Sequence, residues 1–572
     1  MNTTSSTIHI RQMDRWDNPF DPVMTADQAA RILGLDLFRA MDAAAFPTSL
    51  SLSRLVRNET RLIPYQRGDL IVRAGDYGSS AFLVVRGEVA VILPPGLPPE
   101  LLGRLNPKRK SLLQVLRQLW NDTRLPESTH HATLATTTGT LTHHDTGGIT
   151  RVTLADIDTL LQSHPTVTFK AGELFGEIGA LGRFPRSVSV VAATEAEILE
   201  IRWQGLRDLR RYDAHFRDHL NHLYRDRSLK AHLRETPVCR HLDQALLADL
   251  ERMAISEVYG ESDSNNPFWR PQGESPGERL AQEPLIVAEG EVIDGLILIQ
   301  SGFARISQKL NHGHRTVGFL GRNRMFGLAE SLHRLRTGTP VATPLSLRAI
   351  GYVQTLRLPY AILASHVLPH LSPEFARATI AARGGTIFEG LDREDVGLIE
   401  FLVEHHYINA TAAMLIDLDR CVRCDQCVVA CARAHDNNPR FVRQGRRHGA
   451  VMVAAACMHC LDPVCMIGCP TGAIHRHARG GQLLINDRTC IGCATCANSC
   501  PYGTILMVET RDAQGRYQHN QESGLPILKA TKCDLCLEQW GGPACERACP
   551  RRALLRANMW DTRHLRHWMG WQ

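Results

Sequence analysis

The chain has 572 residues, of which 44% are apolar and 22% are charged. This length is too great for one core and predicts roughly three or four domains, and the apolar fraction excludes a chain that is disordered throughout. The formal net charge of +6 argues only weakly for acidic partners and does not by itself imply nucleic acid.

Residues 1–47 are predicted to form an N-terminal extension with a helical stretch at 25–46. The first residues lack the basic-then-apolar pattern of a secretory signal, and no stretch approaches 18 uninterrupted apolar residues. We therefore expect no membrane span and a cytoplasmic location, where thiols stay reduced.

A long-period repeat follows the extension. Residues 70–87 align without gaps with residues 285–302, so that Gly75 matches Gly290 and Gly87 matches Gly302. In each copy, short runs of β-branched residues and leucine are separated by glycine, which is typical of strands joined by tight turns. The repeat therefore predicts two antiparallel β domains in tandem, at 48–236 and 237–395.

The two copies of the repeat differ in the length of their loops. Residues 94–168 are far longer than their counterpart in the second copy and rich in proline, threonine and histidine, so we expect a surface insertion that is partly disordered. Residues 259–282 favour a similar loop in the second copy. Apolar residues at three- and four-residue spacings predict an amphipathic helix at 203–234 that bridges the two domains.

Residues 175–190 of the first copy, FGEIGALGRFPRSVSV, place Glu177 nine residues before Arg186. A helix that opens at Gly176 offers N–H groups to an anion, an arginine matches two phosphate oxygens, and a carboxylate accepts a sugar hydroxyl. The segment resembles the phosphate-binding cassette of cyclic nucleotide-binding domains. The resemblance implies that Glu177 holds the ribose, that Arg186 holds the phosphate of cyclic AMP or cyclic GMP, and that Ser187 assists.

The second copy departs from this cassette. After Phe326 it has Leu328 in place of the acid and Thr337 in place of the arginine. We expect no cyclic nucleotide there, and a β-roll kept for docking or for association of two copies is the preferred interpretation. For the first copy, ligand binding and the same docking role both stay open. No helix-turn-helix pattern follows either copy, so no nucleic acid partner is expected.

The C-terminal region holds sixteen of the seventeen cysteines; the other, Cys239, reads as a small buried apolar residue. The sixteen form four sets of four: Cys421, Cys424, Cys427 and Cys431; Cys457, Cys460, Cys465 and Cys469; Cys490, Cys493, Cys496 and Cys500; Cys533, Cys536, Cys545 and Cys549. Two sets have the Cys-x2-Cys-x2-Cys-x3-Cys spacing of [4Fe–4S] proteins, in which the fourth thiolate binds a neighbouring cluster. Four zinc sites would also fit the count, but zinc modules usually present separated pairs. Proline follows the last cysteine of three sets, which predicts a short helix beginning there.

The motifs DRCVRCDQCVVAC, CMHCLDPVCMIGCPTGAI, CIGCATCANSCPYG and KCDLCLEQWGGPACERACPRRAL resemble the four-cluster ferredoxin subunit of molybdenum-dependent oxidoreductases, including the dimethyl sulfoxide reductase type. The resemblance implies that sets one and four exchange their last cysteines, and that sets two and three do the same. The implied ligand groups are Cys421, Cys424 and Cys427 with Cys549; Cys533, Cys536 and Cys545 with Cys431; Cys457, Cys460 and Cys465 with Cys500; Cys490, Cys493 and Cys496 with Cys469.

The sequence therefore predicts an α+β multidomain protein, with two antiparallel β-rolls of the cyclic nucleotide-binding type followed by a double ferredoxin-like iron–sulfur domain at 396–572. The expected function is electron relay through four [4Fe–4S] clusters to or from the catalytic subunit of a partner oxidoreductase. No catalytic residue is assigned, because the sequence has no Gly-x-Gly-x-x-Gly motif after a strand, no Walker loop and no recognisable flavin or pterin site. The alternative is an iron–sulfur sensor of oxygen or redox state that signals through the β-rolls.

Overall fold

The structure is a computed structural model that describes residues 7–559 except 94–95, 99–100, 103–139, 145–149, 183–184, 240–241, 261–279, 281, 311–312, 376, 378–392, 436, 513, 538 and 540. The chain forms two compact units, each described here by itself. Unit 1 comprises Met1–Arg225, Asp425–Val442 and Asp462–Cys549, and unit 2 comprises Asp226–Cys424, Arg443–Leu461 and Pro550–Gln572. Within the described residues, no helix is long and apolar enough to cross a bilayer.

Unit 1 begins with the strand β1 (Thr7–Ile10) and the helices α1 (Ala26–Leu33), α2 (Asp36–Arg39) and α3 (Leu52–Glu59). The side chains of Thr25 and Gln28 cap α1 reciprocally, which satisfies backbone N–H groups at the start of the helix. The buried faces of α1 and α3 pack into the same apolar core as Leu206. The helical stretch expected at 25–46 is thus present as two short helices rather than one.

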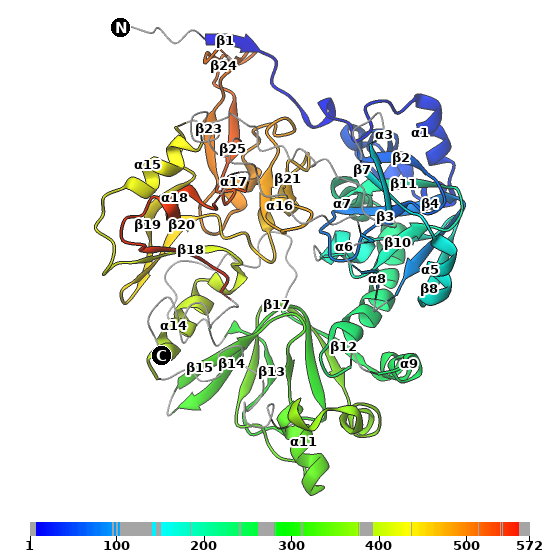
Figure 1. Cartoon of the computed structure of the whole chain (residues 1–572), viewed down its shortest axis with the longest axis vertical. Helices are drawn as coiled ribbons and strands as arrows, with labels where there is room; N and C mark the ends of the chain where they lie inside the picture. The colour runs from blue at the N-terminus through cyan, green and yellow to red at the C-terminus, as the bar shows by residue number, and fades with distance from the viewer. Residues whose placement is uncertain are drawn as a thin grey trace. The chain divides into compact units, whose positions relative to one another are not determined.

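The first β-roll consists of two four-stranded antiparallel sheets (Figure 1), with strand orders β3-β10-β5-β8 and β2-β11-β4-β9. Its strands are β2 (Thr60–Tyr65), β3 (Leu70–Val72), β4 (Ser80–Arg86), β5 (Glu88–Ile92), β8 (Thr166–Lys170), β9 (Leu174–Phe175), β10 (Ser189–Ala192) and β11 (Ala196–Arg202). The short helix α6 (Glu177–Gly182) follows β9. Val84 and Ile198 are fully buried between the sheets.

Part of the insertion at 94–168 belongs to the core of the first β-roll, so the expectation of a surface excursion is wrong for that part. The strands β6 (Thr140–His144) and β7 (Thr150–Leu154) pair with each other, and α5 (Ile157–Ser163) follows them. Val152 and Leu154 pack against Leu70 and Ile92, because apolar residues recur inside a segment whose composition is otherwise polar. Residues 103–139 and 145–149 lie outside the described part of the chain.

The chain continues through α7 (Trp203–Tyr212) and α8 (Ala214–Glu235). The single helix expected at 203–234 is therefore divided. Asp213 separates the two segments with extended backbone angles, and its carboxylate accepts hydrogen bonds from the N–H groups of Phe216 at 2.6 Å and Asp42 at 3.0 Å. An aspartate that satisfies the free N–H groups of a new helix favours a break at this position.

The second β-roll, in unit 2, is a six-stranded antiparallel sheet with the path β12-β17-β14-β15 (Figure 1). Its strands are β12 (Ile255–Tyr259), β13 (Leu285–Val287), β14 (Leu296–Leu310), β15 (Gly313–Leu320), β16 (Met325–Phe326) and β17 (Ser346–Leu358). The accompanying helices are α9 (Gln244–Met253), α11 (Leu328–Thr337) and α12 (Tyr360–Ile362). Cys239 is completely buried in the core that α9 contributes to, as expected.

The repeated glycines have the same structural role in both β-rolls. Gly87 and Gly302 have φ angles of 84° and 82°, and a Cβ at either position would lie 2.2 Å from a carbonyl oxygen, that of Glu195 or of Tyr352. Only glycine fits so close an approach of two backbones. The repeat seen in the sequence therefore reflects the same turn built twice.

The C-terminal region contains short elements between the cysteines. They are α14 (Arg393–Glu404), β18 (Ala413–Asp417), α15 (Gln426–Arg433), β19 (Phe441–His448), β20 (Val451–Ala456), α16 (Val464–Gly468), β21 (Ile474–Arg476), β22 (Leu483–Ile485), α17 (Thr495–Ser499), β23 (Leu506–Glu509), β24 (Tyr517–Asn520), β25 (Leu528–Thr531), α18 (Ala544–Arg547) and β26 (Leu554–Ala557). The pairs β21-β22 and β23-β25 are antiparallel, and β24 pairs in parallel with β1.

Candidate metal centres and nucleotide site

All four cysteine sets form loops with the same unusual backbone conformation. The residue just before the second cysteine of each set has a positive φ angle. These residues are Arg423 at 57°, His459 at 49°, Gly492 at 73° and Leu535 at 61°. Three of the four are not glycine, and such left-handed residues are uncommon and gather at functional sites. A left-handed residue within a short turn can direct successive N–H groups toward an anion, as required around a cluster of sulfurs.

Two helices of this region end at a cysteine that precedes proline, instead of beginning there. The helix α16 ends just before Cys469, and α17 ends just before Cys500. These cysteines have φ and ψ of −69° and 114°, and −73° and 112°, because a following proline disfavours the helical region. The strands β21, β23 and β26 follow the three Cys-Pro steps after a turn. The expected helix after each Cys-Pro is therefore wrong, and proline ends a helix here.

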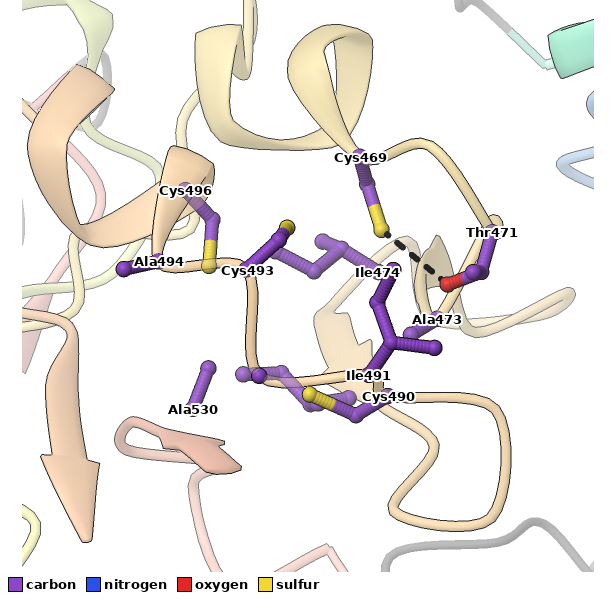
Figure 2. Close-up of a pocket in the computed structure, with 12 residues that line it drawn as sticks. Cys469, Thr471, Ala473, Ile474, Cys490, Ile491, Cys493, Ala494, Cys496 and Ala530 are labelled. Atoms are coloured by element: carbon purple, nitrogen blue, oxygen red, sulfur yellow. Dashed lines mark hydrogen bonds between the residues drawn. The ribbon is translucent and has the colours of Figure 1, made fainter. Parts of the chain in front are cut away.

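Four of the predicted ligands lie around one cavity in unit 1. Figure 2 shows Cys469, Cys490, Cys493 and Cys496 about a common space. Its empty volume is about 330 Å³, part of which is open to solvent. The remaining lining is mainly apolar: Thr471, Ala473, Ile474, Ile485, Ile491, Gly492, Ala494 and Ala530. Cys469 therefore lies with the three cysteines of the next set.

The electrostatics of this cavity favour a cationic occupant. Burial raises the pKa of Cys496 to about 12, and the neighbouring Cys469, Cys490 and Cys493 raise it further in the same direction. Burial also raises the pKa of Cys490, while backbone hydrogen bonds from Ala530 and Gly492 act to lower it. Four close thiolates repel one another unless positive charge lies between them. The residues present therefore fit a metal cluster.

A second group in unit 1 brings Cys431 to the fourth set. The helix α15, which carries Cys431, packs against α18, which carries Cys545. Burial raises the pKa of Cys431 to about 12, and the nearby charges of Cys533 and Cys536 add to this effect. The sulfur of Cys431 accepts the N–H of Arg440 at 3.2 Å. The structure therefore brings the last cysteine of set one beside the first cysteines of set four.

Three polar side chains beside this second group were not identified from the sequence. His435 Nε2 lies 3.7 Å from the sulfur of Cys536 and 3.5 Å from Asp534 Oδ1. Arg440 Nη1 donates to Asp534 Oδ2 at 3.2 Å. His435 and Arg440 are distant from Asp534 in the sequence, and the three follow no motif, although Asp534 directly follows a cysteine. They provide hydrogen-bond donors and charge next to the sulfurs.

The remaining eight cysteines belong to two predicted groups that each draw on both units. Cys421, Cys424, Cys457 and Cys460 are in unit 2, and Cys427, Cys465, Cys500 and Cys549 are in unit 1. Their grouping stays a prediction. Of all sixteen, Cys424 and Cys493 are exposed and the others are buried or half-buried.

The predicted nucleotide site in the first β-roll is centred on a buried arginine. Arg186 donates from Nη1 to the carbonyl of Gly176 at 2.5 Å and from Nη2 to the carbonyl of Ser80 at 2.6 Å. Burial lowers the pKa of Arg186 to about 10, while the carboxylates of Glu200 and Glu177 act in the opposite direction. Glu177 is itself 1% exposed at the start of α6. The acid and the arginine thus lie in one buried environment.

Glycines make room for this guanidinium. A Cβ at Gly78 or Gly179 would lie 2.7 Å or 2.8 Å from an atom of the Arg186 side chain. Gly176 has a φ of 78°, and a Cβ there would lie 3.0 Å from Arg186 Nη1. Ser187 is exposed, so the structure does not bring it into the buried pair. A cyclic phosphate would have to share the arginine with the two carbonyls that it now contacts.

The second β-roll lacks this arginine, but the residue in its place differs from the one expected. Gly75 donates its N–H to the carbonyl of Arg186 at 2.7 Å, and the repeat-equivalent Gly290 donates to that of Thr343 at 2.8 Å. Thr343 and not Thr337 is therefore the counterpart of Arg186, because α11 has ten residues where α6 has six. Leu328 begins α11 as Glu177 begins α6, as expected.

Family models of known proteins match both the C-terminal cysteine region and the two β-rolls. The 4Fe-4S dicluster domain family matches residues 448–558, and the cyclic nucleotide-binding domain family matches residues 152–213 and 278–366. With both families present, the expected α+β fold class, β-rolls followed by a ferredoxin-like domain, is confirmed.

Three relatives from curated proteins illustrate the similarity of the C-terminal region. Electron transport protein HydN of Escherichia coli is 34% identical over 159 residues, which cover 25% of this chain and 85% of HydN. The arsenate respiratory reductase iron-sulfur subunit ArrB of a Shewanella species is 30% identical over 194 residues, which cover 26% of this chain and 82% of ArrB. AegA of Escherichia coli is 34% identical over 151 residues, 25% of this chain, and the chain spans only 21% of AegA. Through its C-terminal quarter, the chain belongs to the family of 4Fe-4S iron–sulfur electron-transport proteins that includes HydN.

Proposed function

We propose that the chain relays electrons through four [4Fe–4S] clusters to or from a partner oxidoreductase. The observation that carries this proposal is the position of Cys469, which faces the same cavity as Cys490, Cys493 and Cys496 instead of completing its own set. This exchange of the last cysteine is characteristic of two-cluster ferredoxins, whereas zinc modules use two nearby pairs. A [4Fe–4S] cluster, when bound, accepts and returns one electron.

The four clusters follow from the four interlocked sets. One is held by Cys490, Cys493, Cys496 and Cys469, and another by Cys533, Cys536, Cys545 and Cys431. By the same exchange, the remaining two are held by Cys421, Cys424, Cys427 and Cys549, and by Cys457, Cys460, Cys465 and Cys500. In all four loops the residue before the second cysteine has a positive φ angle. This shared backbone conformation supports assigning one cluster to each of the four sets.

The reaction that consumes or supplies the electrons is assigned to a partner protein. The names of ArrB and HydN place those relatives in reductase and electron-transport systems. We infer a catalytic oxidoreductase subunit as partner here, and the dimethyl sulfoxide reductase type is one candidate. We also infer a cytoplasmic location, where thiols are kept reduced and can serve as cluster ligands.

Anaerobic stopped-flow spectroscopy tests relay against sensing. Protein reduced with dithionite is mixed with a redox-dye acceptor, and the visible iron–sulfur absorbance is followed. A relay is reoxidised within the mixing experiment and keeps its iron through repeated cycles. A sensor releases iron on oxidation and changes its state of association, which would contradict the relay.

We further propose that cyclic AMP or cyclic GMP binds the first β-roll and affects electron transfer. The segment next to Arg186 contacts the iron–sulfur region within unit 1. Arg186 donates its N–H to the carbonyl of Asp76 at 2.8 Å, and the adjacent Tyr77 donates its N–H to the carbonyl of Ala478 at 2.7 Å. The guanidinium of Arg476 lies 5.2 Å from the centre of the Tyr77 ring.

The contacted segment leads directly to the cavity described above. Arg476 ends β21, and Ile474, two residues earlier, lines the space around Cys469. A change at Arg186 therefore has a short path of backbone hydrogen bonds to one proposed cluster.

Calorimetry with cyclic AMP and cyclic GMP tests this binding. We expect heat with the intact protein and none with Arg186→Ala. The matched control is Thr343→Ala at the equivalent position of the second β-roll, which should leave the heat unchanged. Absence of heat with the intact protein would remove the regulatory proposal and leave the relay intact.

A further inference from the structure

One lysine is completely buried within the iron–sulfur part of unit 1. Lys532 is 0% exposed, and its ammonium group donates hydrogen bonds to the carbonyl of Leu483 and, at 3.1 Å, to the carbonyl of Cys533. A buried ammonium is costly to desolvate unless negative charge compensates it. Two carbonyl dipoles supply hydrogen bonds but no net negative charge.

The position of Lys532 connects the two cysteine groups of unit 1. On one side, Ala530 lines the cavity of Cys469 and Cys490, and its N–H bonds to Cys490. On the other side, Cys533 directly follows Lys532 and belongs to the group of Cys431. Cys533 is the third residue after Ala530, which is a span of about 10 Å at most.

The contact with Leu483 strengthens this placement. Leu483 is 1% exposed and packs in the same apolar cluster as Cys469, Cys490 and Cys496. The ammonium group of Lys532 therefore bonds to Leu483, which packs against one cysteine group. It also bonds to the backbone of Cys533, which belongs to the other group.

Asp534, whose carboxylate interacts electrostatically with Lys532, is already engaged by other side chains. Asp534 accepts from Arg440 at 3.2 Å and lies 3.5 Å from His435. Its pKa is shifted downward although burial alone raises it, because Arg440, His435 and Lys532 favour the charged form. With Asp534 engaged in this way, the two groups of four thiolates would supply the negative charge that balances Lys532 when their clusters are bound.

We propose that Lys532 raises the reduction potentials of the two clusters that flank it. This inference rests on the proposed function. Each added electron increases the negative charge of a cluster, and a buried cation stabilises that charge strongly because little water screens it. Lys532 acts on both clusters through space and through the loops that it holds.

Redox titration monitored by electron paramagnetic resonance tests the proposal on the full chain. Dithionite supplies one electron to each cluster. In Lys532→Met and Lys532→Gln we expect the equilibrium constant for reduction of two clusters to fall at least tenfold, which is 59 mV for a one-electron couple. Glutamine keeps a hydrogen-bond donor but not the charge. Lys532→Arg should stay close to the wild type.

The neighbouring Lys529 provides a matched control. It lies in β25, which ends just before Lys532, is partly exposed, and bonds to the carbonyl of Asp487. Its charge acts on Cys490 from a position that solvent partly screens, so Lys529→Met should change each equilibrium constant less than threefold.

Two results would overturn the role of Lys532. Unchanged potentials in the neutral variants with full iron would exclude an electrostatic effect. Loss of iron in both neutral variants and in Lys532→Arg would assign the residue a purely structural role. A wild-type chain without iron and sulfide would instead overturn the proposed function itself, so the two failures are distinguishable.

Discussion

Replacement of Gly492 by alanine tests whether the third cysteine loop must take the observed shape to hold its cluster. Gly492 has a φ of 73°, which costs an L-residue roughly 1–2 kcal/mol. A Cβ there would also lie 2.0 Å from the carbonyl oxygen of Leu528, and relieving such overpacking costs roughly 1–3 kcal/mol. The sum of roughly 2–5 kcal/mol lowers the population of the intact loop by a factor of roughly 30 to 4,000.

The assay is the iron content of Gly492→Ala after anaerobic reconstitution. We expect the loss of one cluster in four, about a quarter of the iron, with the remaining clusters retained. Gly515→Ala is the matched control, since its φ is 80° but nothing lies within 4 Å of the added Cβ. Full iron and an unchanged resonance spectrum in Gly492→Ala would refute the assignment of this loop to a cluster.

Three further predictions address coupling, stability and pH. Tyr77→Ala should keep the heat of cyclic nucleotide binding but abolish any ligand effect on the rate of cluster reduction, because it removes the ring that contacts Arg476. A ligand effect that persists in stopped-flow traces of this variant would contradict the path through Tyr77. Arg305 is 5% exposed and forms two 2.9 Å hydrogen bonds with the buried Glu283, so Arg305→Met should lower the free energy of unfolding of the second β-roll by about 3–5 kcal/mol. In urea denaturation, the double variant Arg305→Met with Glu283→Leu should recover most of the lost free energy of unfolding. No recovery would show that the buried charge of Glu283 is not the cause of the loss. Burial, with the charge of Arg322, lowers the pKa of His232 to about 3. Since the unfolded chain binds a proton near pH 6.5 and the folded one does not, stability should fall as the pH drops from 6.5 toward 3, by about 2 kcal/mol at pH 5. The free energy of opening of α8, measured by amide hydrogen exchange, should fall with pH in this way. The fall should be absent in His232→Leu.

Much of the β-roll architecture could be predicted from the sequence because backbone constraints leave a visible residue type. Gly87 and Gly302 occupy positions where a side chain would collide with a carbonyl, so the repeat persists in the sequence. The division of the helix at Asp213 and the burial of Val152 were less visible. Both depend on tertiary contacts that local composition does not encode.

The cysteine groups could also be predicted, because ligand spacing follows directly from the geometry of a cluster. Whether a helix begins or ends at each Cys-Pro step could not be predicted, since proline is compatible with both. Lys532 and His435 were missed because burial of a charged residue depends on segments far away in the sequence, such as that of Leu483. Counting the cassette positions from Phe326 also misplaced the counterpart of Arg186, because α11 is longer than α6.

The central claim, that the sixteen cysteines bind four [4Fe–4S] clusters, is tested most directly by the iron and acid-labile sulfide content of anaerobically purified protein. The account predicts about 16 iron atoms and about 16 sulfides per chain. A protein that holds zinc without sulfide would contradict it.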